Sequence, residues 1–345
     1  MERRMNIAIA KDWGDWHGKF AQFLEEYKSQ GINFNFSVIN IDCVDWQEKV
    51  KPFDIVIWNP SYMGIRLANH FKEKVYFMQH ILDKLVVPNF NTVWHFESKV
   101  AESYLLTQYE INTPRTFVSF DYSDARHEME QSDMPIVLKK SEGAASQNVE
   151  LIHNKKRMER VIEDLFWTQL WIKARPWTSK TKYIFNNLTK TWFINWILYR
   201  YGLKQIGDGV ICWQEYIPGN QADLRITVIG DRFAYGFWRN NRPDDFRASG
   251  SGLIDYEREV PKEVINYCLN INNELHFDSM AYDILFTNDS FVINEMSYNY
   301  IDKALFNAPG YYEKSINETL SFKNGHYWPQ ELWIKWLLIK TGCIK

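Results

Sequence analysis

The sequence predicts an α/β protein with more than one domain. Short apolar runs typical of buried strands alternate with segments whose apolar residues recur at helical spacing, and this alternation indicates a parallel sheet covered by helices. A length of 345 residues allows two or three domains. The hydrophobic share of 46% and the charged share of 24% are ordinary for a globular enzyme.

Residues 1–88 are expected to form a small Rossmann-like domain. Strand-like runs occur at 6–10, 34–41 and 54–58. Between the first two runs, four apolar side chains recur at helical spacing, namely Phe20, Phe23, Leu24 and Tyr27. The domain has no GxGxxG motif, so dinucleotide binding is not inferred.

The middle of the chain, residues 89–215, predicts a mixture of helices and short strands. Apolar spacing indicates a helix over 93–106, which Pro114 would end, and a second, charged helix over 155–166. Extended segments are expected at 115–120, 135–139, 149–152 and 210–217, with a small polar loop at 141–147.

Two β-hairpins are predicted beyond residue 216. Residues 224–228 and 233–237 would pair across a turn at Gly230 and Asp231. Residues 282–286 and 291–295 would pair across a turn at 288–290.

The second hairpin would bring two acids together. A loop centred on its turn places Asp283 opposite Glu295, and Ser297 shares their face if the strand continues. Two neighbouring carboxylates repel each other unless a cation lies between them, and Mg²⁺ prefers carboxylates and substrate phosphates. The alternative is a polar hairpin face in water.

Strand-borne cations accompany these acids. Lys139 ends a strand before the small polar loop, Arg225 and Arg239 lie on the first hairpin, and Arg247 follows it. Cations and acids around a small-residue loop suit a nucleoside triphosphate with magnesium. Each residue alone is equally explained as a solvated strand residue, so their joint order carries the interpretation.

Five segments in order resemble the ATP-grasp superfamily, in particular its carboxylate–amine ligase branch, which includes ribosomal-protein glutamate ligases and glutathione-synthetase-like ATP-binding domains. They are Glu97-Ser-Lys99 with Glu110-Ile-Asn-Thr-Pro-Arg-Thr116, Met134-Pro-Ile-Val-Leu-Lys-Lys-Ser-Glu-Gly143, Gln214-Glu-Tyr-Ile-Pro-Gly219, Asp223-Leu-Arg-Ile-Thr-Val-Ile-Gly-Asp231, and the spacing from Asp283 to Glu295. The resemblance covers residues 90–300, about three fifths of the chain.

This resemblance implies an ATP-grasp fold with an α+β lid. The N-terminal Rossmann-like domain (1–88) would be the pre-ATP-grasp domain. The lid subdomain would span 89–215, with an insertion at 167–208. The C-terminal catalytic subdomain would span 216–345.

The resemblance also implies roles for individual residues. Lys99 and Lys139 would contact ATP phosphates from the two sides of a cleft. The adenine pocket and the phosphate loop would supply the other ATP contacts, which are Gln214, Glu215, Tyr216, Ile217 and Ser146. Asp223 would lie near the ribose or orient Arg225.

Chemistry and metal binding are assigned in the same way. Arg225, Arg239 and Arg247 would face the γ-phosphate and the carboxylate that is activated. Mg²⁺, or Mn²⁺, would be held by Asp283, Glu295 and Ser297, with Asn299 as a substitute ligand.

The chain departs from the family pattern at two places. Ser297 stands where relatives usually carry asparagine, although a hydroxyl can still ligate Mg²⁺ or its water. The phosphate loop, Gly143-Ala-Ala-Ser-Gln-Asn-Val149, keeps only one glycine, so its backbone is less free to wrap phosphate. A non-catalytic ATP-binding protein therefore remains an alternative.

An aromatic and basic segment at 167–208 interrupts the lid. The stretch from Leu165 to Gly207 has no Asp or Glu, and the C-terminal tail (328–345) has a similar composition. Such segments suit a membrane interface with lipid-linked substrates. A glycan platform, a partner surface or plain packing would explain them equally.

The function that these features predict is an ATP- and Mg²⁺-dependent ligase that joins a carboxylate to an amine or thiol through an acyl phosphate. Its acid would be an amino acid or a surface-glycan acid. Alternatives are a kinase of the same fold and an ATP-binding regulator. The formal charge of −3 argues against nucleic acid as a partner, and four scattered cysteines favour the cytoplasm, with a peripheral position at the inner membrane face as an option.

Overall fold

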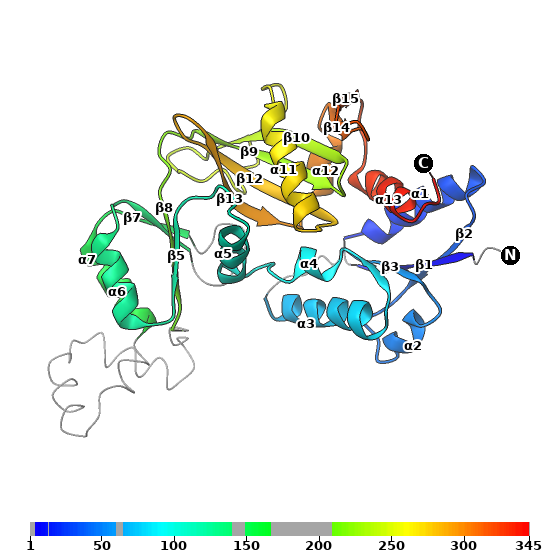
Figure 1. Ribbon diagram of the computed structural model, residues 1–345, viewed down its shortest axis with the longest axis horizontal. Coiled ribbons are helices and arrows are strands. Elements are labelled where there is room, and N and C mark those ends of the chain that lie inside the picture. Colours follow the sequence, from blue (N-terminus) through cyan, green and yellow to red (C-terminus); the bar gives the residue numbers. More distant parts are fainter. Residues whose placement is uncertain (1–3, 13, 60–64, 140–148, 167–208, 345) are drawn as a thin grey trace, which may run out of the picture. The chain divides into compact units, whose positions relative to one another are not determined.

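The computed structural model describes residues 4–12, 14–59, 65–139, 149–166 and 209–344 (Figure 1). The chain divides into two compact units, of which the first comprises residues 1–113 with 217–345 and the second residues 114–216. The predicted insertion at 167–208 lies outside the described residues. The boundaries of the predicted domains stay a prediction.

The first unit begins with a parallel sheet in the strand order β2–β1–β3–β4, which confirms the parallel α/β pattern predicted for the N-terminal region. Its strands are β1 (Met5–Ala10), β2 (Phe34–Ile39), β3 (Ile55–Ile57) and β4 (Leu85–Val87). The helical segments that connect and follow them are α1 (Trp16–Ser29), α2 (Trp46–Val50), α3 (Ile65–Tyr76), the π-helical turn η1 (Phe77–Ile81) and α4 (Phe90–Val93).

The prediction of one helix over 93–106 is wrong at its start, because the helix is interrupted between Val93 and Lys99. Helix α4 ends at Val93, and α5 (Lys99–Gln108) begins six residues later. Glu97 adopts a left-handed conformation, with φ of 59°, and the Ser98 side chain accepts a hydrogen bond from the Ala101 amide. A serine cap of this kind starts a new helix, although the apolar spacing continues across the break.

A seven-stranded antiparallel sheet forms the centre of the first unit. Its strand order is β13–β12–β9–β10–β14–β15, and β11 pairs with β10. The strands are β9 (Ala222–Ile229), β10 (Phe233–Asn240), β11 (Ile254–Asp255), β12 (Ser279–Phe286), β13 (Phe291–Ser297), β14 (Gly310–Lys314) and β15 (Leu320–Asn324). Both predicted hairpins, β9–β10 and β12–β13, are confirmed.

The two faces of this sheet differ in character. Helix α11 (Lys262–Glu274) covers one face (Figure 1), and Leu224 and Ile226 of β9 share an apolar cluster with the buried residues of this helix. On the other face the aromatic rings of Phe233, Tyr235 and Phe237 join a second core with the N-terminal sheet. Charged side chains occupy the remaining part of this second face, and they form the site described below.

The C-terminal tail packs into this second core. Helix α12 (Asp302–Phe306) precedes α13 (Pro329–Lys340), which lies beside α1 (Figure 1). Trp333 is 1% exposed, and its ring centroid lies 5.8 Å from that of Phe20 on α1. The interpretation of the tail as a membrane-interface segment is therefore wrong for the apolar side chains of α13, because those side chains fill the protein core.

The second unit is a small antiparallel sheet with two helices. The strand order is β5–β8–β6–β7, and the helices α6 and α7 pack on this sheet around one apolar cluster. The elements are β5 (Thr116–Ser119), α6 (Tyr122–Gln131), β6 (Ile136–Lys139), β7 (Val149–Ile152), α7 (Lys155–Leu165) and β8 (Ile211–Glu215). All of them were expected from the sequence except α6.

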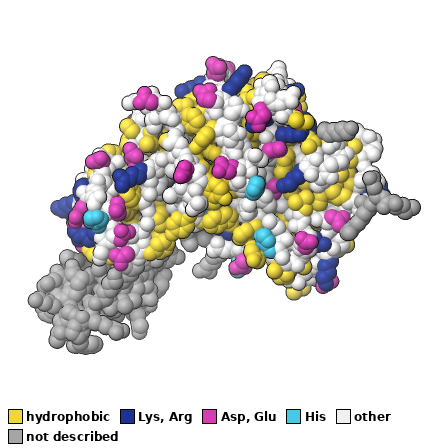
Figure 2. Space-filling view, in the orientation of Figure 1, with side chains coloured by type: hydrophobic (Ala, Val, Ile, Leu, Met, Phe, Trp, Pro, Cys, Tyr) yellow, Lys and Arg dark blue, Asp and Glu magenta, His cyan; other side chains and the backbone are white. Residues whose placement is uncertain are grey.

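Surface charge is mixed in sign. On the face shown in Figure 2, acidic and basic side chains are interspersed over the described residues. Among the helices that the structure describes, none has both the length and the apolar character needed to cross a bilayer.

Candidate active site

Four charged side chains form a chain of ion pairs on the second face of the central sheet. Arg225 contacts both carboxylate oxygens of Asp283, with Nε–Oδ1 at 2.7 Å and Nη2–Oδ2 at 2.8 Å. Arg239 contacts the same carboxylate at 2.7 Å and forms a two-point contact with Asp223, its Nε lying 2.7 Å from Oδ1. Asp283 therefore lies between two guanidinium groups.

Strand register explains why these side chains meet. Asp283 on β12 is paired with Arg225 on β9 and with Glu295 on β13, and Arg239 on β10 is paired with Asp223 on β9. Directly paired residues of an antiparallel sheet project from the same face. The predicted opposition of Asp283 and Glu295 is confirmed, and a register irregularity follows Asp283.

The two aspartates differ in acidity. Burial alone would raise the pKa of Asp283, but the positive charges of Arg225 and Arg239 outweigh this effect and hold the pKa well below its ordinary value. Burial and the neighbouring Asp283 charge raise the pKa of Asp223, although Arg239 opposes the rise. The cause of the difference is that Asp283 contacts two arginines. Asp283 is therefore the more firmly ionised of the two.

Lys99 connects helix α5 to strand β13. Its Nζ lies 2.5 Å from Oε1 of Glu295 and 2.8 Å from Oε2 of Glu102. Burial alone would lower the pKa of Lys99, but the charges of Glu102 and Glu295 raise it, so the ammonium form is favoured. The structure thus brings together six of the predicted site residues, which are Lys99, Asp223, Arg225, Arg239, Asp283 and Glu295.

Glu102 is a site residue that the sequence did not indicate. Its second oxygen, Oε1, accepts the backbone N–H of Met296 at 2.7 Å. Met296 stands between Glu295 and Ser297 in the sequence. The only signal in the sequence is the spacing of three residues from Lys99, which is compatible with an ion pair on any helix.

Two further predicted residues of the first unit are Ser297, which ends β13, and Arg247, which lies in the loop after β10. The Ser297 hydroxyl donates to the Asn299 carbonyl at 3.0 Å and accepts the Asn299 amide at 3.2 Å, so both belong to one tight turn after β13. Arg247 contacts Asp245 in the loop after β10, with Nη2–Oδ2 at 2.7 Å. Asp223 pairs with Arg239, whereas the sequence suggested that it orients Arg225.

The donor set at β12 and β13 fits magnesium. No group of three or more acidic, histidine or cysteine side chains suitable for a metal occurs in the described part of the chain. Mg²⁺, however, is commonly bound by one or two carboxylates together with substrate phosphates and water. Asp283 and Glu295 supply two carboxylates in register, and the hydroxyl of Ser297 lies on the same strand face.

The other predicted nucleotide contacts belong to the second unit, except Ile217, which belongs to the first. Lys139 is the last residue of β6 and is 6% exposed. The Gln214 side chain donates to Thr116 Oγ1 at 2.8 Å, and the exposed Glu215 donates its amide to the Arg115 carbonyl. Tyr216 and Ile217 are partly buried, and Ser146 lies outside the described residues.

Comparison with known proteins identifies the fold. Residues 97–175 match the family model described as a RimK-like ATP-grasp domain. The chain also aligns with a RimK-domain ATP-grasp protein from Sphaerobacter thermophilus, with a TM-score of 0.52 and 14% identity, over 84% of this chain and 90% of the other. The chain therefore has the ATP-grasp fold.

Two further relatives have named activities. The D-alanine–D-alanine ligase from Bacillus anthracis gives a TM-score of 0.51 with 13% identity, over 86% of each chain. The α-aminoadipate–LysW ligase LysX of Saccharolobus solfataricus is 22% identical over 213 residues, which are 61% of this chain. The match spans 65% of the length of that relative.

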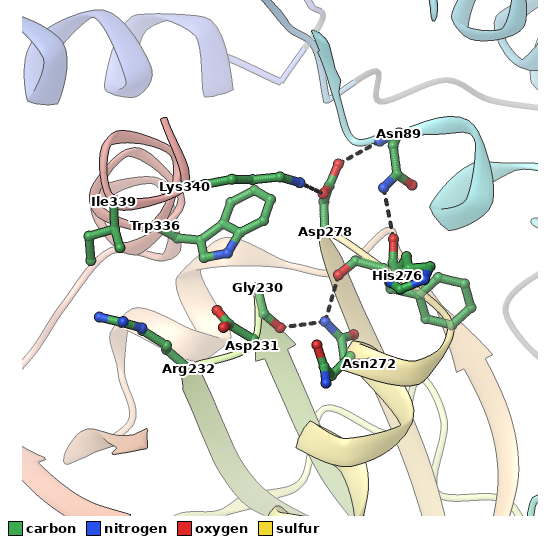
Figure 3. A pocket seen from close by; sticks show the side chains of 12 residues that line it. Asn89, Gly230, Asp231, Arg232, Asn272, His276, Asp278, Trp336, Ile339 and Lys340 are labelled. Carbon is green, nitrogen blue, oxygen red and sulfur yellow. Dashed lines mark hydrogen bonds and ion pairs between the residues drawn. The ribbon is translucent and has the colours of Figure 1, made fainter. Parts of the chain in front are cut away.

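A cavity of about 400 Å³ lies elsewhere in the first unit, between α11, α13 and the β9–β10 turn (Figure 3). Asp278 lines it, accepts the Asn89 amide at 2.7 Å and pairs with Lys340 at 3.0 Å. None of the predicted site residues lines this cavity. Like Glu102, Asp278 accepts a backbone amide and pairs with a lysine. It is therefore a matched control residue outside the candidate site.

Proposed function

We propose that this protein is an ATP- and Mg²⁺-dependent ligase that joins a carboxylate to an amine or thiol through an acyl phosphate. The observation that supports it is the in-register opposition of Asp283 and Glu295 beside Arg225, Arg239 and Lys99. Acids that can hold a metal and cations that can neutralise phosphate then share one sheet face. The named ligases among the relatives support the same reaction class.

The proposed reaction has two steps. A carboxylate oxygen of the acid attacks the γ-phosphorus of ATP, and the bond from that phosphorus to the bridging oxygen breaks to release ADP. The amine nitrogen then attacks the acyl carbon, the carbon–oxygen bond to phosphate breaks, and phosphate leaves as the nitrogen loses a proton to water. No side chain of the protein needs to act as a nucleophile.

The arginines would neutralise the charge that develops. Arg225 uses Nε and Nη2 for Asp283, so its Nη1 remains for an oxyanion of phosphate or of the acyl group. Arg239 is 8% exposed and is fixed by two aspartates, so its charge is held in place before substrate binds. Fixed charges of this kind favour the transition state without reorganisation.

Asp283 and Glu295, with Ser297, would hold Mg²⁺. When bound, the ion would neutralise the phosphate oxygens and polarise the γ-phosphoryl group. Lys99 would add a positive charge at Glu295 and at the phosphates. Lys139 of the second unit stays a prediction as a further phosphate contact.

An amino acid is the acid we propose first, because the named relatives include ligases for D-alanine and α-aminoadipate. A surface-glycan acid, a lipid-linked substrate and a peripheral membrane position depend on residues 167–208, outside the described part of the chain. They remain weaker proposals, because Trp333 and Trp336 of the tail are buried.

Product analysis tests this function. The protein is incubated with Mg·ATP and a panel of amino acids, uronic acids and sugar nucleotides, with and without an amine, and ADP, phosphate and product mass are measured. Release of ADP and phosphate that requires the amine, with an amide mass gain, is the expected result. Phosphate retained on an acceptor would establish a kinase, and tight ATP binding with no turnover would indicate a regulator.

A further inference from the structure

Glu102 contacts both helix α5 and strand β13. One carboxylate oxygen accepts the Met296 amide at 2.7 Å, and the other contacts the Lys99 ammonium at 2.8 Å. Glu102 is 5% exposed, so both contacts are shielded from water. One side chain therefore connects a residue proposed to bind phosphate with the backbone that carries two residues proposed to bind metal.

We infer that Glu102 is a positioning residue for magnesium and ATP, an inference that rests on the proposed function. Its hydrogen bond to the Met296 amide holds this stretch of β13, and so fixes the positions of the neighbouring residues Glu295 and Ser297. It also keeps Lys99 in place when Glu295 turns from Lys99 to the metal.

The charges around Lys99 explain why a second acid is needed. Without ligands, the ammonium lies between Glu102 and Glu295, at 2.8 and 2.5 Å. A metal at Glu295 would compete with Lys99 for that carboxylate. If Glu102 were neutral, Glu295 would be the carboxylate left in direct contact with Lys99, and a metal at Glu295 would have to displace the ammonium from that contact.

The backbone contact has a different consequence. A glutamine at position 102 can still accept the Met296 amide through its carbonyl oxygen, because the side chains have nearly the same shape. Glu102→Gln therefore removes the charge but keeps the hydrogen bond to β13. The variant separates the electrostatic role of Glu102 from its role in folding.

The test measures how much Mg²⁺ is needed for ATP binding, using calorimetry on the full chain. We expect Glu102→Gln to raise the Mg²⁺ concentration for half-maximal ATP binding at least tenfold, while the thermal midpoint without ligand changes by only a few degrees. Asp278→Asn is the matched control, because Asp278 also pairs with a lysine and accepts a backbone amide (Figure 3). It should lower the thermal midpoint and leave the Mg²⁺ requirement unchanged.

Two outcomes decide the inference. Equal Mg²⁺ requirements in Glu102→Gln and the wild type would overturn it and leave Glu102 a structural residue. If Glu102→Gln does not fold, Glu102→Asp replaces it, since it keeps the charge but is too short for both contacts. At least a threefold rise is then expected, and no rise overturns the inference. Absence of Mg·ATP binding by the wild type would instead reject the proposed function.

Discussion

Arg225 on β9 and Asp283 on β12 are directly paired strand residues whose side chains form a two-point ion pair, with contacts of 2.7 and 2.8 Å. The geometry uses the planar fork of the guanidinium, which a lysine cannot reproduce. Together with Arg239, this fork holds the Asp283 carboxylate in place.

The first prediction concerns this fork. Arg225→Lys keeps the charge but loses one of the two contacts, so we expect kcat/KM for Mg·ATP to fall by about 10- to 100-fold. Steady-state ADP release measures the effect. Arg157→Lys is the control, because Arg157 forms the same two-point contact with Glu150 at an exposed position in the second unit. Equal losses in the two variants would contradict the assignment.

The second prediction is a pH dependence of stability. The pKa of Asp283 in the folded protein is held below its ordinary value of 3.8, so the ionised carboxylate stabilises the fold at pH above about 4. That contribution is lost as pH falls toward the pKa of the folded state. Asp283→Asn removes it at every pH and leaves the buried Arg239 and the partly buried Arg225 without this partner.

Thermal unfolding at several pH values measures this contribution. At pH 7 we expect Asp283→Asn to unfold at a temperature lower by about 5–10 °C, which corresponds to about 3 kcal/mol for a broken buried ion pair. The difference from the wild type should shrink at pH 3. A difference that stays constant or grows in acid would show that the Asp283 charge does not stabilise the fold.

The third prediction concerns two glycines with left-handed backbone conformations. Gly230 has φ of 61°, and a Cβ there would lie 2.0 Å from the Trp336 ring, whereas Gly219 has φ of 87° and open space. Gly219→Ala should cost about 1–2 kcal/mol from backbone strain alone. Gly230→Ala adds a clash with a buried indole, so we expect a loss larger by at least about 1 kcal/mol.

Urea unfolding of the two glycine variants supplies the comparison. Equal losses in the free energy of unfolding would mean that Trp336 moves away from Gly230 at no cost. Both positions lie outside the charged cluster, so the Mg²⁺ requirement for ATP binding should not change in either folded variant.

The sequence predicted much of the fold because its strongest signals are local. Alternation and turn residues define the β12–β13 hairpin, and a hairpin's loop fixes its register, which is why Asp283 was placed opposite Glu295. Contacts between distant segments have no such signal. Glu102 and Met296 are 194 positions apart, and nothing in either segment indicates the other.

One error of the sequence interpretation and one contact that it did not predict have the same physical origin. The apolar spacing of 93–106 continues across the break at Glu97 and Ser98, because both short helices face the core while the chain turns between them. Asp223 was assigned to the ribose or to Arg225, but the twist and pairing of β9 and β10 place it against Arg239. In both cases tertiary packing selects among local possibilities.

The last prediction concerns the C-terminal helix. Trp333 on α13 packs against Trp16 and Phe20, and its Nε1 donates to the Tyr300 hydroxyl at 2.8 Å. Trp333→Ala removes a fully buried ring, so we expect the free energy of unfolding to fall by about 3–5 kcal/mol.

Phe322→Ala is the control for this variant, because Phe322 is 47% exposed on β15 and should cost less than about 1 kcal/mol. Co-sedimentation with anionic vesicles, measured in parallel, should not depend on Trp333, since a side chain in the core cannot reach lipid while the protein is folded. Wild-type stability combined with lost vesicle binding in Trp333→Ala would restore the membrane-interface interpretation of the tail.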